Sequence, residues 1–159
     1  QLMDSSRYFK MKFTVMPIHI VLDKALKEAM DRIALKKIKL EVDYSAQPAS
    51  VLVDQEKIKI AFLNIILNAI EAMEEGKGVL RIEVKSRPNV HEVIISDNGC
   101  GMSEEVSARL FEPYFTAKPN GVGLGLSSAF AIIQSHKSTI EVASKVNEGT
   151  VFTISFPSL

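Results

Sequence analysis

Residues 62–73 read FLNIILNAIEAM, a helical pattern with two faces of different chemistry. One side is apolar and predicts a buried face, at about 100° per residue, made of Ile58, Phe62, Ile65, Ile66, Ala69 and Met73. Asn64, Asn68 and Glu71 follow at steps of four and three, so they share a separate narrow face. Asparagine is a poor helix former because its side chain competes with the backbone, so two on one face need a reason. Ordinary surface polarity is one reading. The other is that these oxygens hold a hard cation such as Mg²⁺.

The segments around this helix predict a single α+β domain. Helices are expected over 21–34, over 54–75 with Asp54 as N-cap, over 104–110 with Ser103 as N-cap, and over 126–136. Strands are expected over 12–16, 39–44, 79–86, 92–96, 139–144 and 150–156. This order predicts a two-layer α/β sandwich with helices packed on one face of a mixed sheet. We assign 13–159 to this domain and 1–12 to a linker or the stub of an upstream helical domain.

The composition is that of an ordinary globular protein. With 159 residues, 47% of them hydrophobic, the chain is long enough to bury a sizeable core. Its 19 basic and 19 acidic side chains cancel, so no overall field favours nucleic acid or an anionic membrane. The single Cys100 rules out an internal disulfide and fits a reducing, cytoplasmic compartment. No apolar run reaches the roughly 18–20 residues of a membrane span. Because the chain begins at Gln1 rather than methionine, we expect a longer protein, and a membrane anchor could belong to its other parts.

A glycine-rich loop follows the strand that ends near Asp97, where the sequence reads DNGCG. A carboxylate in this place can accept a hydrogen bond from the exocyclic amine of adenine. Gly99 and Gly101 would let the backbone approach a flat ring closely. An ordinary Asp-Asn-Gly turn explains the same residues without a ligand.

A second glycine-rich segment, GVGLGLS at 121–127, leads directly into a helix. Free backbone N–H groups at a helix N-terminus can bind phosphate, and glycines permit the approach. The segment is neither the phosphate loop that ends in GKS/T nor the GxGxxG dinucleotide pattern, and a flexible loop at a helix start is the alternative. Lys118 is a candidate phosphate contact or a solvated loop lysine.

Taken together and in this order, these segments resemble the ATP-binding catalytic domain of bacterial sensor histidine kinases. NIILNAIEAM (64–73) is similar to the N box and SDNGCGM (96–102) to the first glycine box. LFEPYFTAKP (110–119) is similar to the F box and GVGLGLS to the second glycine box. The unbroken F box looks most like that of nitrogen-regulator-type kinases. The resemblance implies the Bergerat-type fold of the superfamily that also contains gyrase B, mismatch-repair ATPases and heat-shock chaperone ATPases.

The resemblance also implies a role for each matched position. Asn68 would ligate Mg²⁺, with Asn64 supporting the metal or phosphates and Glu71 linked to the metal. Asp97 would accept a hydrogen bond from the adenine amine, and Thr150 would help through water. Phe111 and Phe115 would anchor a mobile lid spanning roughly 112–122, and Lys118 would close onto the γ-phosphate. The remaining implied nucleotide contacts are Gly99, Gly101, Gly121, Gly123, Gly125 and Leu126.

The implied activity is that of a protein histidine kinase. In the ATP-hydrolysing relatives a glutamate that activates water takes the place of Asn64, and an asparagine cannot be that base. We therefore expect transfer to a histidine on a separate dimerisation domain of a homodimer, with a response regulator downstream. His19, His91 and His136 do not match the acceptor pattern, so we interpret all three as structural. Two alternatives stay open: an anti-sigma-factor-type serine kinase, and a non-catalytic module whose nucleotide stabilises an interaction surface.

One departure from the family pattern lies at the end of the last predicted helix. These domains commonly carry His-Gly-Gly there, and this chain reads His136-Lys137-Ser138. The turn must therefore be made with less backbone freedom.

Overall fold

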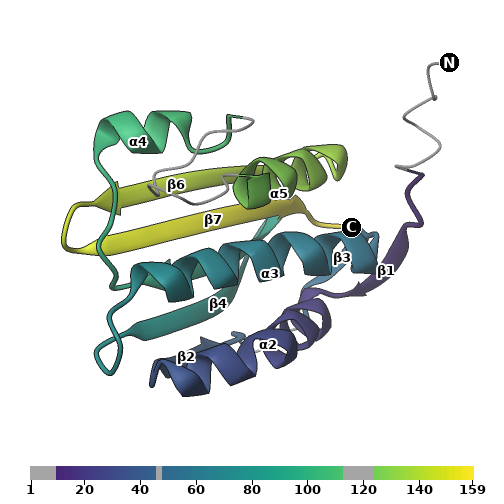
Figure 1. The fold of residues 1–159 in the computed structure, drawn as a ribbon. Helices are drawn as coiled ribbons and strands as arrows, with labels where there is room; N and C mark the ends of the chain where they lie inside the picture. The colour runs from purple at the N-terminus through teal and green to yellow at the C-terminus, as the bar shows by residue number, and fades with distance from the viewer. Residues whose placement is uncertain (1–9, 46–47, 113–123) are drawn as a thin grey trace, which may run out of the picture.

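The computed structural model describes residues 10–45, 48–112 and 124–159, and these form helices layered on a sheet (Figure 1). The elements in chain order are β1 (Thr14–Pro17), α2 (Ile18–Leu35), β2 (Lys39–Asp43), β3 (Ser50–Val53), α3 (Gln55–Ala72), β4 (Val79–Arg87), β5 (Val90–Asp97), α4 (Glu104–Arg109), α5 (Leu124–Ser135), β6 (Thr139–Lys145) and β7 (Gly149–Pro157). No helix among these residues is long and apolar enough to cross a membrane.

Within the described residues, five strands form a mixed sheet in the order β2-β4-β5-β7-β6. β2 runs parallel to β4, and the other neighbouring strands are antiparallel. Side chains in register form rows across the buried face of the sheet. Val93, Ile154 and Ile140 make one row, and Ile95, Phe152 and Val142 make the next. The predicted α+β sandwich with a mixed sheet is confirmed.

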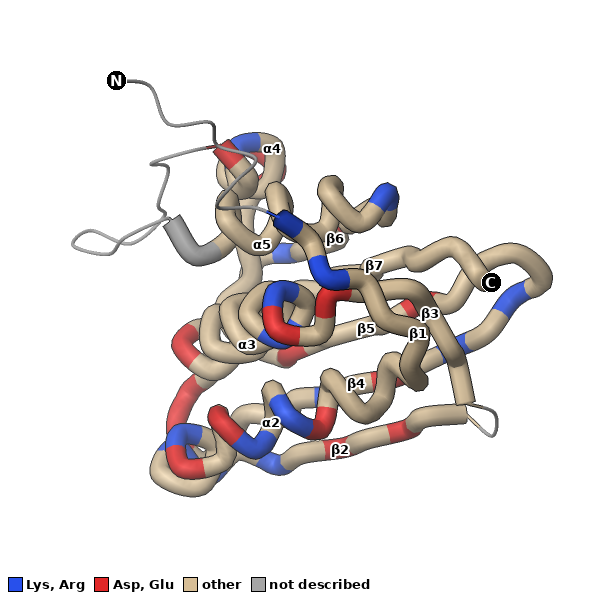
Figure 2. The backbone as a smooth tube through the Cα atoms, turned by 90° about the vertical axis from the view of Figure 1, so that its right-hand side faces the viewer, with Lys and Arg blue, Asp and Glu red and all other residues tan. Residues whose placement is uncertain are grey.

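Helices α2, α3 and α5 lie along the same face of this sheet (Figures 1 and 2). α3 lies between the other two and packs against both. Its predicted apolar face is buried in full. Phe62, for example, has no exposed surface and meets the Phe156 ring edge-on, with centroids 6.2 Å apart. Burying such a side chain stabilises the fold by roughly 1.5–3 kcal/mol relative to leaving it exposed.

The opposite face of the sheet is polar where β2 and β4 pair. Arg81 on β4 lies between two carboxylates of this face, with Nη1 3.1 Å from Glu41 Oε1 and Nε 3.3 Å from Glu83 Oε2. Strand residues alternate between faces, so these charges sit directly behind buried Leu80 and Ile82. The alternation explains why β4 was recognisable from its sequence.

The start of α3 agrees with the sequence, and its end does not. Asp54 caps the helix as predicted, because its Oδ1 accepts the N–H of Lys57 at 3.2 Å. The helix ends at Ala72, three residues before the predicted end at residue 75. Its last carbonyl groups bond to other parts of the fold: Lys36 Nζ donates to Ile70 O at 2.8 Å and to Glu71 O at 3.3 Å. These tertiary bonds satisfy the free carbonyls of a helix end.

A separate two-stranded sheet lies beside the start of α3 (Figure 1). β1 pairs with β3 in antiparallel register, and Val15 lies opposite Leu52. β3 was not predicted. β3 has only four residues and closely follows Pro48, so its pattern is too short to assign a strand. Its partner β1 is also distant in the sequence.

Candidate nucleotide-binding site

A row of polar side chains ends the buried face of the sheet. Asp97 on β5 is in register with Thr150 on β7, and Thr150 is in register with Ser144 on β6. Each lies two residues beyond the apolar row of Ile95, Phe152 and Val142, and residues two apart share a face. At this end the core-facing surface therefore changes from hydrocarbon to one carboxylate and two hydroxyl groups.

Asp97 is a half-buried hydrogen-bond acceptor. Its Oδ1 accepts the N–H of Gly99 at 2.8 Å. Burial raises the pKa of Asp97 above its ordinary value, and hydrogen bonds from the Gly99 and Thr150 amides oppose this rise in part. Two carboxylate oxygens offer about four acceptor positions, so capacity remains for a donor such as an exocyclic amine.

The glycines of this loop are needed for packing within the protein. A Cβ atom on Gly99 would lie 2.5 Å from Ala72 O at the end of α3. Gly101 has a φ of 67°, and a Cβ there would overlap Lys145 O. The sequence left open whether both glycines permit the approach of a ligand or belong to an ordinary turn. The structure adds a reason that needs no ligand.

α3 brings the asparagine pair to the same end of the molecule. Asn64 and Asn68 are half-buried and Glu71 is exposed. The N–H of Cys100 donates to Ala72 O at 3.0 Å, so the Asp97 loop contacts the helix one turn, about 6 Å of rise, beyond Asn68. The three polar residues therefore lie off the buried face of α3, on the part of the helix that leads to this loop, and their roles in binding stay predictions.

The donor chemistry of this face fits a divalent ion only together with phosphates. Asn64 and Asn68 offer neutral amide oxygens, which suit a hard cation. No cluster of three or more His, Cys, Asp or Glu residues that could hold a metal occurs in the described parts of the chain. Most of the negative charge around an ion would therefore come from the nucleotide.

Phe111 fixes the start of the segment that resembles the F box. Its ring stacks on Phe130 of α5 with centroids 5.0 Å apart, and it meets Phe152 of β7 at 6.4 Å. Leu126, near the start of α5, is buried. The chain is therefore anchored to the core on both sides of the undescribed residues 113–123.

Residues 53–159 match the family model of the histidine kinase-, DNA gyrase B- and HSP90-like ATPases. The chain belongs to this ATPase family. Sporulation kinase B of Bacillus subtilis is 41% identical over 105 residues, which are 66% of this chain and 24% of that protein. The sensory histidine kinase/phosphatase NtrB of Vibrio alginolyticus is 32% identical over 153 residues, covering 89% of this chain and 43% of NtrB.

The fold of this ATPase domain is also that of a solved kinase domain. The nucleotide-free catalytic domain of histidine kinase ThkA superposes with a TM-score of 0.84 at 28% identity, covering 93% of this chain and 97% of ThkA's. The resemblance to sensor histidine kinases, including the nitrogen-regulator type, is confirmed. The chain spans about a quarter or less of the sporulation kinases that it matches.

Several predicted contacts of this ATPase domain are not placed by the structure. Phe115, Lys118, Gly121 and Gly123 lie outside the described residues, and Gly125 is described only as part of α5. Their roles at the phosphates stay predictions, as does the mobile lid.

Ser144 was missed by sequence analysis. A lone serine in a strand carries no signal of its own, and only the register of β6 against β7 brings it beside Thr150. To find Ser144 from the sequence, one would have to predict the register in which β6 pairs with β7.

Proposed function

We propose that this chain is the ATP-binding catalytic domain of a sensor histidine kinase, which transfers the γ-phosphate of ATP to a histidine on a separate dimerisation domain. The observation that carries the proposal is the half-buried Asp97, held by the Gly99 amide beside the end of the asparagine helix, in a member of this ATPase family. The Asp97 carboxylate accepts the adenine amine, and Thr150 assists through water.

The asparagine face supplies the phosphate end of the site in this proposal. Asn68 holds Mg²⁺, and Asn64 and Glu71 support it. When bound, Mg²⁺ would neutralise the charge of the phosphates. Asn64 has no proton-accepting group of suitable basicity, so it does not activate water. Transfer to another nucleophile is therefore favoured over hydrolysis.

The accepting histidine belongs to another part of the protein. His136 is buried, and both ring nitrogens are occupied: Nε2 accepts the N–H of Asp54 at 3.0 Å, and Nδ1 lies 2.7 Å from Ile132 O. A nitrogen that is engaged in this way has no lone pair for attack on a phosphate. His136 is therefore unsuited to accept the phosphate, which agrees with the proposed acceptor on a separate dimerisation domain of a homodimer.

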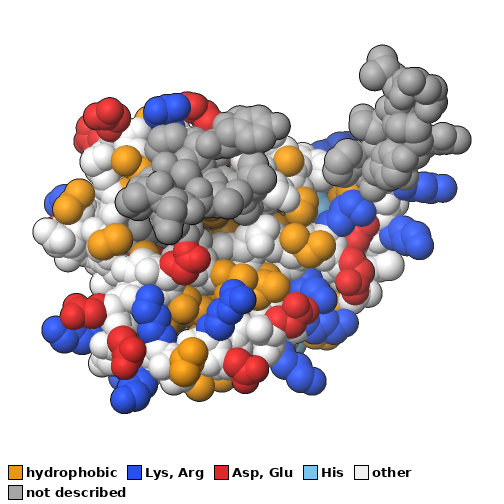
Figure 3. All heavy atoms as spheres, in the orientation of Figure 1, with side chains coloured by type: hydrophobic (Ala, Val, Ile, Leu, Met, Phe, Trp, Pro, Cys, Tyr) orange, Lys and Arg blue, Asp and Glu red, His pale blue; other side chains and the backbone are white. Residues whose placement is uncertain are grey.

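A response regulator is the proposed downstream partner. ThkA has been crystallised in complex with the response regulator protein TrrA, and that copy of ThkA superposes on this chain with a TM-score of 0.79. We propose a cytoplasmic location, which a chain with a single cysteine fits because its fold uses no internal disulfide. The face shown in Figure 3 carries acidic and basic side chains intermixed over α2 and α3, so partner choice does not rest on one sign of charge there.

Calorimetric titration with a non-hydrolysable ATP analogue, with and without Mg²⁺, tests the pocket. Asp97→Asn replaces an acceptor oxygen by an amide donor that opposes the adenine amine, so binding should weaken at least about tenfold. Asp31→Asn, the same change at an exposed position of α2, should bind like the unaltered protein. Equal affinity of the Asp97→Asn variant and the unaltered protein would contradict the assignment of Asp97.

The transfer step is tested with the full-length protein and γ-labelled ATP. Label on histidine is lost in acid, because the P–N bond is acid-labile, whereas label on serine is retained. Acid-labile label that disappears in Asn68→Ala supports the histidine kinase. Acid-stable label would instead indicate a serine kinase, and ATP binding without any label would indicate a non-catalytic module.

A further inference from the structure

A buried polar contact joins the start of α3 to the end of α5, far along both helices from the proposed phosphate end of the site. Asp54 and His136, which form it, are only 5% and 6% exposed. The N–H of Asp54 donates to His136 Nε2 at 3.0 Å, and His136 Nδ1 lies 2.7 Å from Ile132 O, one turn back in α5. The His136 ring therefore bridges the backbones of the two helices.

The chain that enters the domain is bound at the same contact. The N–H of Lys12 donates to Asp54 Oδ2 at 2.9 Å, while Asp54 Oδ1 accepts the N–H of Lys57 and caps α3. The Phe13 ring packs edge-on against His136. Each carboxylate oxygen of Asp54 and each ring nitrogen of His136 thus has a partner within the protein. These groups hold segments of the chain together rather than offering themselves to a ligand.

The two helices run in opposite directions between this contact and the other end of the molecule (Figure 1). Asn68 follows Asp54 by fourteen residues, about 21 Å of helical rise. α5 begins at Leu124, twelve residues before His136, a rise of about 18 Å. α3 and α5 pack side by side. Apolar contacts between them are non-directional, whereas the Asp54–His136 hydrogen bond has one donor and one acceptor in a fixed geometry.

We propose that Asp54 and His136 are positioning residues that fix how far α5 is shifted along α3, and thereby the distance between the asparagine face and the start of α5. In the proposed ATP site these two parts meet the same phosphate groups, so a shift of one helix would draw one part away from them. The adenine contact at Asp97 lies on the sheet and does not depend on this shift. The inference rests on the proposed binding of ATP and concerns the phosphates of the nucleotide.

His136→Asn and His136→Gln test the bond, because their amide groups differ in reach by one methylene. The asparagine amide takes the place of Nδ1, so it meets Ile132 O but does not reach Asp54. The glutamine amide takes the place of Nε2, and its oxygen accepts the Asp54 N–H. Affinity for a non-hydrolysable ATP analogue with Mg²⁺ should fall roughly fivefold or more in His136→Asn. In His136→Gln it should fall less than about twofold.

Adenosine, which lacks phosphates, separates positioning from a general loosening of the site. Its affinity, followed by NMR shifts so that weak binding is measurable, should change less than about twofold in His136→Asn. His91→Asn makes the same substitution at a half-buried histidine of β5 and should bind both ligands like the unaltered protein. An equal loss for both ligands in His136→Asn, or no loss for either, would overturn the positioning role while ATP binding stands. Failure of the unaltered protein to bind the ATP analogue would overturn the proposed function and this inference with it.

Hydrogen exchange of the unaltered protein covers the case in which His136→Asn does not fold. Because coupling between two sites is reciprocal, bound phosphates should stabilise the Asp54–His136 bond. Saturation with the ATP analogue and Mg²⁺ should therefore slow exchange of the Asp54 amide roughly fivefold or more beyond the slowing at Val93, an amide in the middle of β5. Slowing at Asp54 no greater than at Val93 would overturn the proposal.

Discussion

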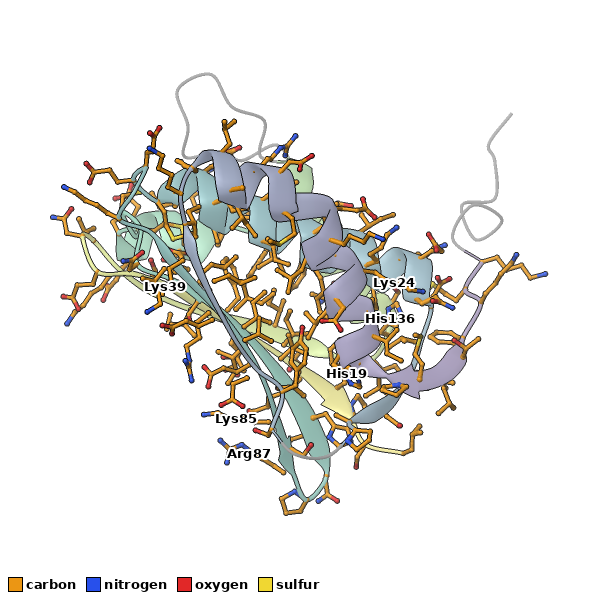
Figure 4. All side chains as sticks on the ribbon, turned by 90° about the horizontal axis from the view of Figure 1, so that it is seen from below. His19, Lys24, Lys39, Lys85, Arg87 and His136 are labelled. Carbon is orange, nitrogen blue, oxygen red and sulfur yellow. The ribbon has the colours of Figure 1, made fainter. Side chains whose placement is uncertain are left out.

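His136 is a buried titratable residue whose two hydrogen bonds require one protonation state. Nε2 must accept from the Asp54 amide, so the proton is assigned to Nδ1, which donates to Ile132 O. Phe13 of the incoming chain meets the His136 ring edge-on, with centroids 5.5 Å apart, and Figure 4 shows His136 near the β1 end of the molecule. Burial lowers the pKa of His136, and the bond to Ile132 and the charge of Asp54 oppose this in part.

The free energy of unfolding should therefore fall in mild acid. The unfolded histidine takes up a proton near pH 6.5, whereas the folded one does so only at lower pH. The stabilisation is complete above about pH 6.5 and is lost as the pH falls toward the folded pKa, by at most about 1.4 kcal/mol per pH unit. His136→Gln, which keeps an acceptor oxygen, should flatten this dependence in urea unfolding between pH 7 and pH 5. His91→Gln is the control, and parallel curves for the His136→Gln variant and the unaltered protein would refute the assignment.

At the scale of elements, α2 and α5 end in the same way. Lys37 and Lys137, which follow these helices, both have a φ of 54°. After α5, the N–H of Lys137 donates to Gln134 O at 2.9 Å and the N–H of Ser138 donates to Ile133 O at 3.2 Å. This pair of bonds is the Schellman motif, in which glycine is usual at the left-handed position. The missing glycine noted in the sequence is therefore replaced by a lysine in a left-handed conformation.

Lys137→Gly should stabilise the domain. An L-residue in the left-handed region costs roughly 1–2 kcal/mol, and the greater freedom of glycine in the unfolded chain offsets part of the gain. A net gain of roughly 0.5–1 kcal/mol should raise the Tm by about 1–4 °C in thermal unfolding. Lys85→Gly makes the same change within β4 and should lower the Tm, since glycine weakens a strand interior. A fall in both variants would show that the left-handed backbone is not strained.

At the scale of the whole molecule, the loop of residues 97–102 holds three distant segments together. Cys100 donates to Ala72 O at the end of α3. Asn98 Oδ1 accepts the N–H of Val79 at 2.8 Å where β4 begins, and Asn147 of the β6–β7 hairpin donates to Cys100 O. The geometry around Asp97 therefore depends on the relative placement of a helix, a strand and a hairpin.

Two glycine variants measure how much the packing of this loop against the β6–β7 hairpin contributes to the free energy of unfolding. In Gly76→Ala the new Cβ has no neighbour within 4 Å, so the only loss of stability comes from placing an alanine at a φ of 80°. This loss is roughly 1–2 kcal/mol. Gly101→Ala has a similar backbone cost and must also displace Lys145 O, which should add roughly 1–3 kcal/mol. Denaturant unfolding of both variants gives the difference. Equal losses of unfolding free energy in the two variants would mean that the contact between the loop and the β6–β7 hairpin does not contribute to stability.

Many features of this chain follow from residues two, three or four apart, and these were predictable from the sequence. They include the buried face of α3, the caps at Asp54 and Ser103, and the alternating pattern of β4, because local spacing determines which residues share a face. The asparagine face and the loop that follows Asp97 were likewise visible in the sequence, whereas Gly121 and Gly123 of the second glycine loop lie outside the described residues.

Other features depend on which distant strands meet and in which register, and only the tertiary structure decided them. β3 forms because β1 is available as its partner, and α3 stops early because Lys36 and Cys100 take its last carbonyl groups. Ser144 joins the site only through the pairing of β6 with β7. A shift of one residue in that pairing would turn its hydroxyl to the opposite face, so no local pattern in the sequence determines its role.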